Sequence, residues 1–200
     1  MNKDPITAHY GYPALLEQLT QANATKPKAI ALLSIESQHN SDLQLGVTDS
    51  KKRHNSQLNA LALKLDAKTF YIRPGLFALS FTRLIDGQWL EDECRALFHT
   101  DSEEPSLRIG LLNLPLMANV DIKIDAVTHF EVLQMALYGA RSLPDAACAY
   151  VSFKTLDFAP VSIFNQPLFL HLSKAIERGL VRVDTSGNKD AIQWPQAEID

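Results

Sequence analysis

Two apolar runs that flank a turn-forming dipeptide constrain the fold of this chain more than any other feature. The stretch FYIRPGLFALSF places one run before Pro74-Gly75 and another after it. Proline presets the backbone angle φ at one turn position and glycine accepts a positive φ at the next, so this pair is typical of tight turns. We therefore predict two antiparallel strands, Lys68–Arg73 and Leu76–Arg83, joined as a hairpin.

Strand-like and helix-like segments extend this pattern along the chain. Short apolar runs predict further strands, and apolar residues at intervals of three or four predict helices. The further predicted strands are Ala29–Glu36, Ser106–Leu112 and Ala147–Phe153. Four helices are predicted: the first begins at Pro13, the second ends near Leu65, the third spans Gly87–Phe98, and the fourth follows Asp125, which caps it. This mixture indicates the α+β class, a sandwich in which helices flank a central, mostly antiparallel five-stranded sheet.

Composition excludes several classes of protein. The chain has 200 residues, of which 46% are hydrophobic, and this fraction predicts a globular core. The formal net charge of −4 argues against a nucleic-acid-binding protein, because neutralising phosphates requires clustered positive charge. No apolar run reaches the ~18 residues that span a bilayer, and the N-terminal segment lacks the apolar core of a signal peptide. We expect a soluble, cytoplasmic protein.

The residues that most often bind metals show no suitable spacing. The two cysteines, Cys94 and Cys148, are too few for a disulfide framework and predict buried, reduced thiols. Cys94 and His99 are placed on different sides of a helix by their separation in the chain. The sequence therefore predicts neither a metal site nor another cofactor.

Three segments, taken in order, resemble the GGDEF domain, which is the diguanylate cyclase fold of bacterial signalling proteins. The opening DPITAHYGYPALLEQL is similar to the family's Asp-Pro-Leu-Thr-Gly-Leu-Pro-Asn-Arg, LRIGLL to its Ser-Ile-Gly-Val strand, and LQMALYGAR to its Ala-Asp-x-Ala-Leu-Tyr-x-Ala-Lys helix. The matching positions are Asp4, Pro5, Thr7, Ala14, Leu15, Leu16, Leu19, Ala136, Leu137, Tyr138 and Ala140. The resemblance spans residues 4–157 and implies a GGDEF-like domain over residues 1–157, with the sandwich fold of nucleotidyl cyclases.

The positions that would carry the chemistry depart from the family pattern. The resemblance implies that Mg²⁺ is held by the first acid of a strand-end Asp-x-Asp and by an acid of the signature hairpin. Here Ser34 stands at the first position, and Arg73-Pro74-Gly75-Leu76-Phe77 stands where Gly-Gly-Asp-Glu-Phe is usual. Such Mg²⁺ ions are commonly held by one or two carboxylates, and both are missing at Ser34 and Leu76. We therefore assign no catalytic residue and expect no diguanylate cyclase activity.

Three functions remain open at this point. The first is a catalytically inactive regulatory or interaction module of bacterial cyclic di-GMP signalling, whose partner is an active GGDEF or EAL protein or an effector. The second is a sensor that still binds GTP or cyclic di-GMP, with Glu36 and Asp42 as residual nucleotide-binding residues. The third is an active nucleotidyl cyclase that uses Glu36 with other ligands.

Two further features each have two interpretations. Leu76 at the hairpin tip either offers an exposed apolar contact to a partner or folds back onto the domain's own core. Residues 158–200 form a predicted extension, with a helix from Asn165 to Gly179 and a hairpin around Ser186-Gly187-Asn188. The same extension also resembles the entry to an EAL phosphodiesterase domain.

Overall fold

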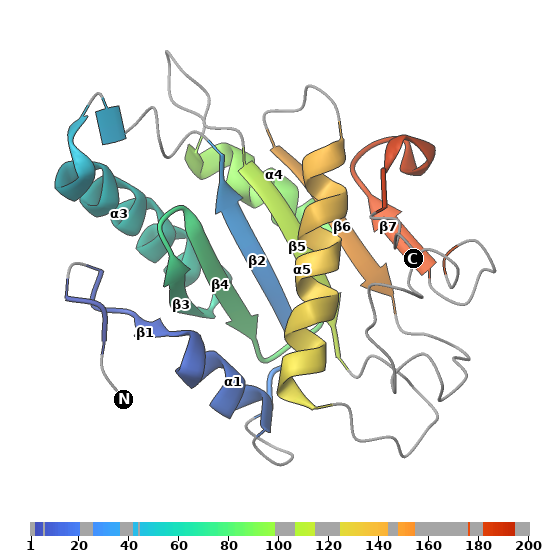
Figure 1. Ribbon diagram of the computed structural model, residues 1–200, viewed down its shortest axis with the longest axis horizontal. Coiled ribbons are helices and arrows are strands. Elements are labelled where there is room, and N and C mark those ends of the chain that lie inside the picture. Colours follow the sequence, from blue (N-terminus) through green and yellow to red (C-terminus); the bar gives the residue numbers. More distant parts are fainter. Residues whose placement is uncertain are drawn as a thin grey trace, which may run out of the picture.

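The computed structural model contains one seven-stranded sheet with helices on both faces (Figure 1). It describes residues 3–5, 7–20, 26–36, 42–43, 45–98, 107–114, 125–143, 148–154, 176 and 182–194. The strands are β1 Tyr10–Gly11, β2 Ala29–Ile35, β3 Ala67–Arg73, β4 Leu76–Phe81, β5 Leu107–Asn113, β6 Cys148–Lys154 and β7 Arg182–Thr185. The described helices are α1 Tyr12–Thr20, α3 Val47–Leu65, α4 Gly87–Phe98 and α5 Ala126–Ser142.

The predicted fold class is confirmed, and the five predicted strands all form. The strand order is β1-β3-β4-β2-β5-β6-β7, so the count of five was too low. The two strands that were not predicted are β1, which pairs with β3 through only two residues, and β7, which pairs with β6. Pairing is mostly antiparallel; β1 with β3 and β5 with β6 are the parallel pairs among the described strands.

Strand β2 is the centre of the sheet. All seven of its residues are buried, which explains why AIALLSI shows no apolar–polar alternation: helices cover both of its faces. It pairs antiparallel with β4 on one side and β5 on the other, so Leu32 lies between Ala78 and Gly110. The end of β2 is thereby held at the same edge as the hairpin tip.

The two faces of the sheet carry separate apolar clusters. Helices α1 and α5 pack on one face, and α3 and α4 pack on the other. Figure 1 shows α5 running along β5 and β6, with α1 beside its first turns. Asp125 caps α5 as predicted, because its Oδ1 accepts a hydrogen bond from the backbone N–H of Thr128 at 2.7 Å.

The hairpin forms with the predicted turn at its tip. Gly75 has a φ of 72°, the positive value that the second central position of a type II turn requires. The backbone N–H of Ile35 donates to the Gly75 carbonyl at 2.8 Å, which ties the turn to the end of β2. The hairpin tip and the strand end therefore form one rigid edge.

The C-terminal region differs from its prediction. No returning strand follows the turn at Ser186-Gly187-Asn188 within residues 182–194; β7 pairs with β6, and a 3₁₀ turn, Lys189–Ala191, comes next. Asn188 favours that turn because its side chain accepts a hydrogen bond from the Asp190 N–H. The helix predicted from Asn165 to Gly179 lies outside the described residues except for Ile176, and the boundary at residue 157 stays a prediction.

Two other observations bear on the sequence predictions. Cys94 and Cys148 are buried free thiols, as expected. In the part of the chain that the structure describes, no helix is both long enough and apolar enough to cross a membrane.

Candidate functional site

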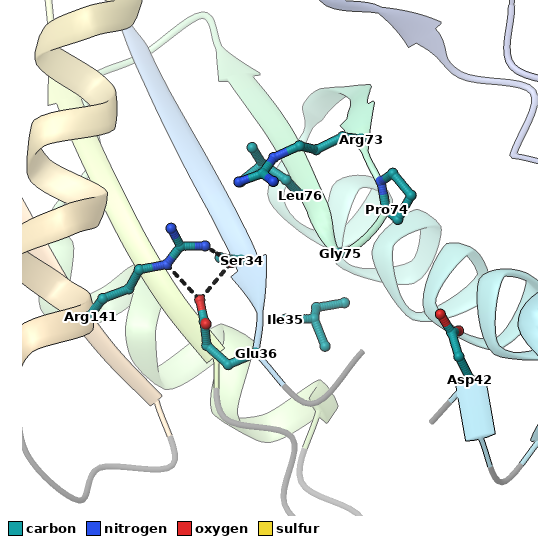
Figure 2. A pocket seen from close by; sticks show the side chains of 9 residues that line it. All are labelled: Ser34, Ile35, Glu36, Asp42, Arg73, Pro74, Gly75, Leu76 and Arg141. Carbon is teal, nitrogen blue, oxygen red and sulfur yellow. Dashed lines mark hydrogen bonds and ion pairs between the residues drawn. The ribbon is translucent and has the colours of Figure 1, made fainter. Parts of the chain in front are cut away.

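A pocket of about 280 Å³ opens where the hairpin tip meets the end of β2 (Figure 2). It brings together the end of β2, Asp42, the hairpin turn and the end of α5. The lining residues are Ser34, Ile35, Glu36, Asp42, Arg73, Pro74, Gly75, Leu76 and Arg141. All but one of the residues predicted for the site therefore lie around a single pocket; the exception is Phe77, which packs in the core on the α3 and α4 face.

Arg141 reaches into this pocket from the last turn of α5 and binds the end of β2. Its Nε donates to Glu36 Oε1 at 2.7 Å, and its Nη2 donates to Ser34 Oγ at 2.7 Å. The Ser34 hydroxyl in turn donates to Glu36 Oε1 at 2.7 Å. The three side chains form a closed set of charge-assisted hydrogen bonds, which are stronger than neutral ones.

The carboxylate of Glu36 is held in its charged form. Burial alone would raise the pKa of Glu36, but hydrogen bonds from Ser34 and Arg141 and the charges of Arg141 and Arg108 together lower it. Arg108 is only 8% exposed and lies opposite Ser34 on β5. Two guanidinium groups thus act on the single carboxylate at this strand end.

Leu76 is part of the core. It is 4% exposed and belongs to the apolar cluster under α1 and α5, so the second of its two interpretations holds. Its side chain lines the pocket but does not project from the surface as an apolar contact for a partner. The exposed side chains of the tip are Arg73 and Pro74.

Asp42 lies on a different side of the pocket from Glu36. Figure 2 shows the Glu36 carboxylate turned toward Arg141, whereas the Asp42 carboxylate lies on the other side of Ile35. The two acids therefore do not converge on one point. Within the described residues, no group of three histidine, cysteine or acidic side chains is arranged to hold a metal ion.

These residues do not fit the Mg²⁺ ion that the resemblance implies. Ser34 is a neutral hydroxyl, Leu76 has no ligand atom, and Glu36 is already neutralised by a guanidinium. A divalent cation here would also meet the charge of Arg141, which lies beside the Glu36 carboxylate. What the arrangement offers is a polar pocket with two arginines and two separated acids.

Arg141 is the site residue that sequence reasoning missed. Its signal was present, because the helix segment LQMALYGAR ends in a basic residue where the family has Lys. No role followed from that match, since nothing in the sequence states that α5 ends beside β2. The tertiary contact supplies this information.

Comparisons with known proteins identify the fold. No protein-family model matches the sequence, and no curated protein matches it. Solved structures do match: the GGDEF domain of TpbB (YfiN) from Pseudomonas aeruginosa has a TM-score of 0.59 at 15% identity, covering 74% of this chain and 92% of that one. The S helix-GGDEF-EAL portion of Vibrio cholerae LapD, bound to c-di-GMP, has a TM-score of 0.58 at 14% identity, covering 88% of this chain and 42% of that one.

A third similar structure is the diguanylate cyclase SiaD from Pseudomonas aeruginosa in complex with its activator SiaC. Its TM-score is 0.52 at 17% identity, covering 70% of this chain and 57% of that one. At these identities the likeness establishes the fold. The chain has a GGDEF-like fold, and its structural relatives are GGDEF domains of cyclic di-GMP signalling proteins.

Proposed function

We propose that this chain is a catalytically inactive GGDEF-like module that regulates other proteins of bacterial cyclic di-GMP signalling by binding to them. The observation that carries the proposal is the ion pair between Arg141 and Glu36. It places a fixed positive charge beside the remaining acid of the strand end. A cation-dependent phosphoryl transfer needs unpaired carboxylates at that point.

The burial of Leu76 supports the same proposal. Leu76 lines the pocket but is only 4% exposed and belongs to the core, so a charged metal ligand at this position would have to be buried among apolar side chains. Catalysis of phosphoryl transfer rests almost entirely on placing charges around the phosphates, and here two of the implied anionic groups are absent. On this proposal the chain keeps the fold without the acidic groups that the resemblance implies for the reaction.

A protein partner is supported by the relatives and by the pocket rim. SiaD, a diguanylate cyclase with a similar fold, is solved in complex with its activator SiaC. In the present chain the rim carries the exposed Arg73, whose positive charge suits an acidic partner surface. The partner we propose is an active GGDEF or EAL protein, or an effector, with an acidic patch.

A nucleotide sensor is the second candidate, and a specific observation favours it. The chain has a pocket at this position although the implied metal ligands are missing. Two arginines, Arg73 and Arg141, line it and suit the phosphates of GTP or cyclic di-GMP. Asp42 supplies an acceptor that suits the amino group of guanine. Binding of this kind would need no metal ion.

The decisive experiment measures product and binding on the same purified protein. We incubate it with GTP and either Mg²⁺ or Mn²⁺ and quantify cyclic di-GMP by chromatography; we expect none above a protein-free blank. Turnover that disappears in Glu36→Ala would refute the proposal and support an active cyclase. Titration calorimetry with GTP and with cyclic di-GMP then separates the two candidates, since saturable binding that weakens in Arg141→Gln favours the sensor.

The regulatory role is tested with an active partner. We add increasing protein to an active GGDEF cyclase or an EAL phosphodiesterase of the same signalling system and measure its rate. We expect a saturable change in rate that Arg73→Glu weakens, because the rim charge is reversed. Lys28→Glu is the matched control, since Lys28 is exposed and lies at the opposite end of β2 from the pocket. No change in the rate of any such enzyme would refute the regulatory role.

A further inference from the structure

We call the segment Arg182–Trp194 the C-terminal strap. It begins as the edge strand of the sheet and ends on the face that α5 covers. Its first part is β7, which pairs antiparallel with β6. Its last part lies on the α5 face of the sheet, where Ile192 is 8% exposed and packs in the cluster under α5. The strap therefore contacts both layers of helices.

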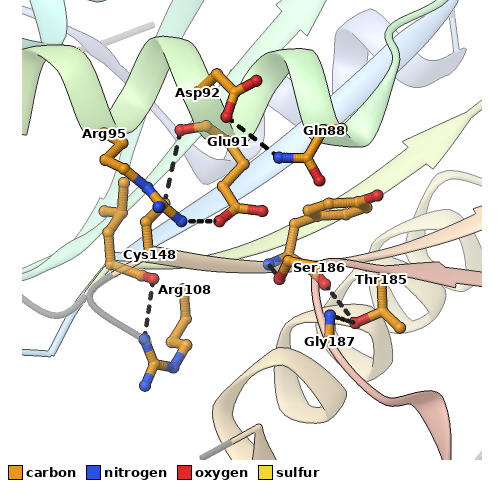
Figure 3. Close-up of polar contacts among 11 residues, drawn as sticks. Gln88, Glu91, Asp92, Arg95, Arg108, Cys148, Thr185, Ser186 and Gly187 are labelled. Atoms are coloured by element: carbon orange, nitrogen blue, oxygen red, sulfur yellow. Dashed lines mark hydrogen bonds and ion pairs between the residues drawn. The ribbon is translucent and has the colours of Figure 1, made fainter. Parts of the chain in front are cut away.

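The first end of the strap is anchored to β6. Thr185 Oγ1 donates to the Tyr150 carbonyl at 2.9 Å, and the Tyr150 N–H donates to Ser186 Oγ at 3.0 Å. Figure 3 shows Ser186 next to Glu91 of α4, on the face opposite α5. This end is bound through backbone groups and does not depend on the pocket.

The other end of the strap holds the last turn of α5. The Gln193 N–H donates to Ser142 Oγ at 3.1 Å, and Ser142 Oγ donates to the Gly139 carbonyl at 2.8 Å. The ring of Trp194 lies against Gly139, so closely that a Cβ at that glycine would be 3.0 Å from it. Trp194 also packs on Phe153 of β6, with 5.8 Å between ring centroids.

Arg141 lies in the same helical turn and points elsewhere. Residues 139 and 142 are three apart and share one side of the helix, whereas residue 141 projects from a different side. From there it reaches Glu36 and Ser34. One turn of helix is thus held by the strap on one side and by the pocket on the other.

The last turn of a helix depends on such outside contacts. Its final carbonyls lack partners within the helix, and helix ends open locally at low free-energy cost. Here the Ser142 hydroxyl donates to the Gly139 carbonyl, and the Gln193 N–H of the strap donates to that hydroxyl. Loss of the strap removes the Gln193 hydrogen bond and the Trp194 packing from the helical turn that carries Arg141.

We propose that the C-terminal strap regulates the pocket: its docking on α5 holds Arg141 against Glu36, and its release frees both side chains for a ligand or partner. Thermodynamic linkage makes the effect reciprocal, so whatever draws Arg141 away from Glu36 weakens docking of the strap. The coupling concerns residues of this chain alone. It stands whether the pocket takes a nucleotide, a protein or neither.

The forward test uses Trp194→Ala in the full chain. We expect amide hydrogen exchange in residues 139–142 to accelerate about fivefold or more, and the Glu36 pKa, followed by carboxyl NMR, to rise from its lowered value. Trp89→Ala is the matched control: it also removes a partly buried indole, but one on α4 that packs with Arg83. We expect it to change neither quantity.

The reverse test perturbs the pocket and observes the strap. In Glu36→Gln we expect exchange of the Gln193 amide to accelerate about fivefold, because that amide is bound to the turn that Arg141 leaves. Arg73→Gln lines the same pocket from the hairpin and should leave this amide unchanged.

Two results would overturn the coupling. One is an unchanged Glu36 pKa in Trp194→Ala, and the other is unchanged Gln193 exchange in Glu36→Gln. If Trp194→Ala accelerates exchange throughout the chain, Ser142→Ala replaces it, because this variant removes one side-chain hydroxyl and little volume. A raised Glu36 pKa in Ser142→Ala supports the proposal, and an unchanged one refutes it. Neither readout requires catalysis or nucleotide binding.

Discussion

Gly110 of β5 lies directly beneath the backbone of Leu137 in α5. A Cβ placed on Gly110 would be 2.5 Å from the Leu137 nitrogen and 2.7 Å from the Leu133 carbonyl oxygen. Only glycine allows the helix to approach the strand this closely, and the approach sets the height at which α5 carries Arg141 to the end of β2.

The first prediction concerns this contact. Gly110→Ala should lower the free energy of unfolding by about 1–3 kcal/mol, because the added methyl group meets backbone atoms that cannot rotate away. Urea unfolding measures the change. Gly11→Ala in β1 is the control, since a Cβ there meets its nearest atoms at 3.7 Å, an ordinary contact distance. Equal stabilities of Gly110→Ala and the wild type would contradict the close packing of α5 on β5.

The second prediction concerns the lost ligand positions. Ser34→Asp combined with Leu76→Glu should not produce cyclic di-GMP from GTP and Mg²⁺. Leu76 is 4% exposed, so its replacement by glutamate buries a charge and should cost on the order of 3 kcal/mol. Arg141 would also neutralise the new aspartate beside Glu36.

A volume-conserving change separates charge from packing at this position. Leu76→Met should cost less than about 1.5 kcal/mol. Thermal unfolding of Leu76→Met and of the double variant distinguishes the cost of changed packing from the cost of a buried charge. Cyclic di-GMP formation by the double variant would contradict the prediction, because it would show that the pocket retains the rest of a cyclase site.

The third prediction concerns acid stability. Because Ser34 and Arg141 outweigh burial, the pKa of Glu36 is lower in the folded chain than its usual 4.5. The resulting stabilisation is fully present above pH 4.5 and is lost as the pH falls through the folded-state pKa. Glu36→Gln lacks it, so the difference in melting temperature between wild type and variant should shrink on acidification below pH 4.5.

The control for this measurement is Glu17→Gln, which removes an exposed carboxylate from α1. A difference in melting temperature between wild type and Glu36→Gln that stays constant from neutral pH to pH 3 would contradict the ion pair. Glu36 and Arg141 are each exposed by more than a third, so solvent screens the pair and keeps the effect small.

The fourth prediction has the opposite sign and concerns Glu91. This side chain is 2% exposed; burial raises its pKa more than the charge of its partner Arg95 lowers it. The folded chain therefore holds a proton that the unfolded chain releases, so stability falls as the pH rises above 4.5 through the folded-state pKa.

Glu91→Gln removes this penalty while keeping an acceptor for Arg95. We expect the variant to gain stability relative to the wild type at pH 8 and to lose that advantage at pH 4, as measured by urea unfolding. Glu17→Gln, which removes an exposed carboxylate from α1 on the other face of the sheet, is the control. A constant difference between Glu91→Gln and wild type at both pH values would contradict the raised pKa.

Features that depend on neighbours in the chain were predictable from the residues. The Pro74-Gly75 turn, the Asp125 cap and the uninterrupted apolar run of β2 follow from local backbone preferences and from periodicity. The same holds for the resemblance to GGDEF domains, because its motifs are short segments in a fixed order. These features identified the fold class and pointed to the edge of the sheet where the pocket lies.

Contacts between distant segments were decided only when the chain folded. Arg141 and Glu36 are 105 residues apart, and no local pattern states that a helix end will meet that strand end. The burial of Leu76 and the path of the C-terminal strap from β6 to Gly139 depend likewise on how whole elements pack. Such contacts follow from the close approach of α5 to Gly110 and from the order of the strands, which are properties of the packed core that a linear pattern does not contain.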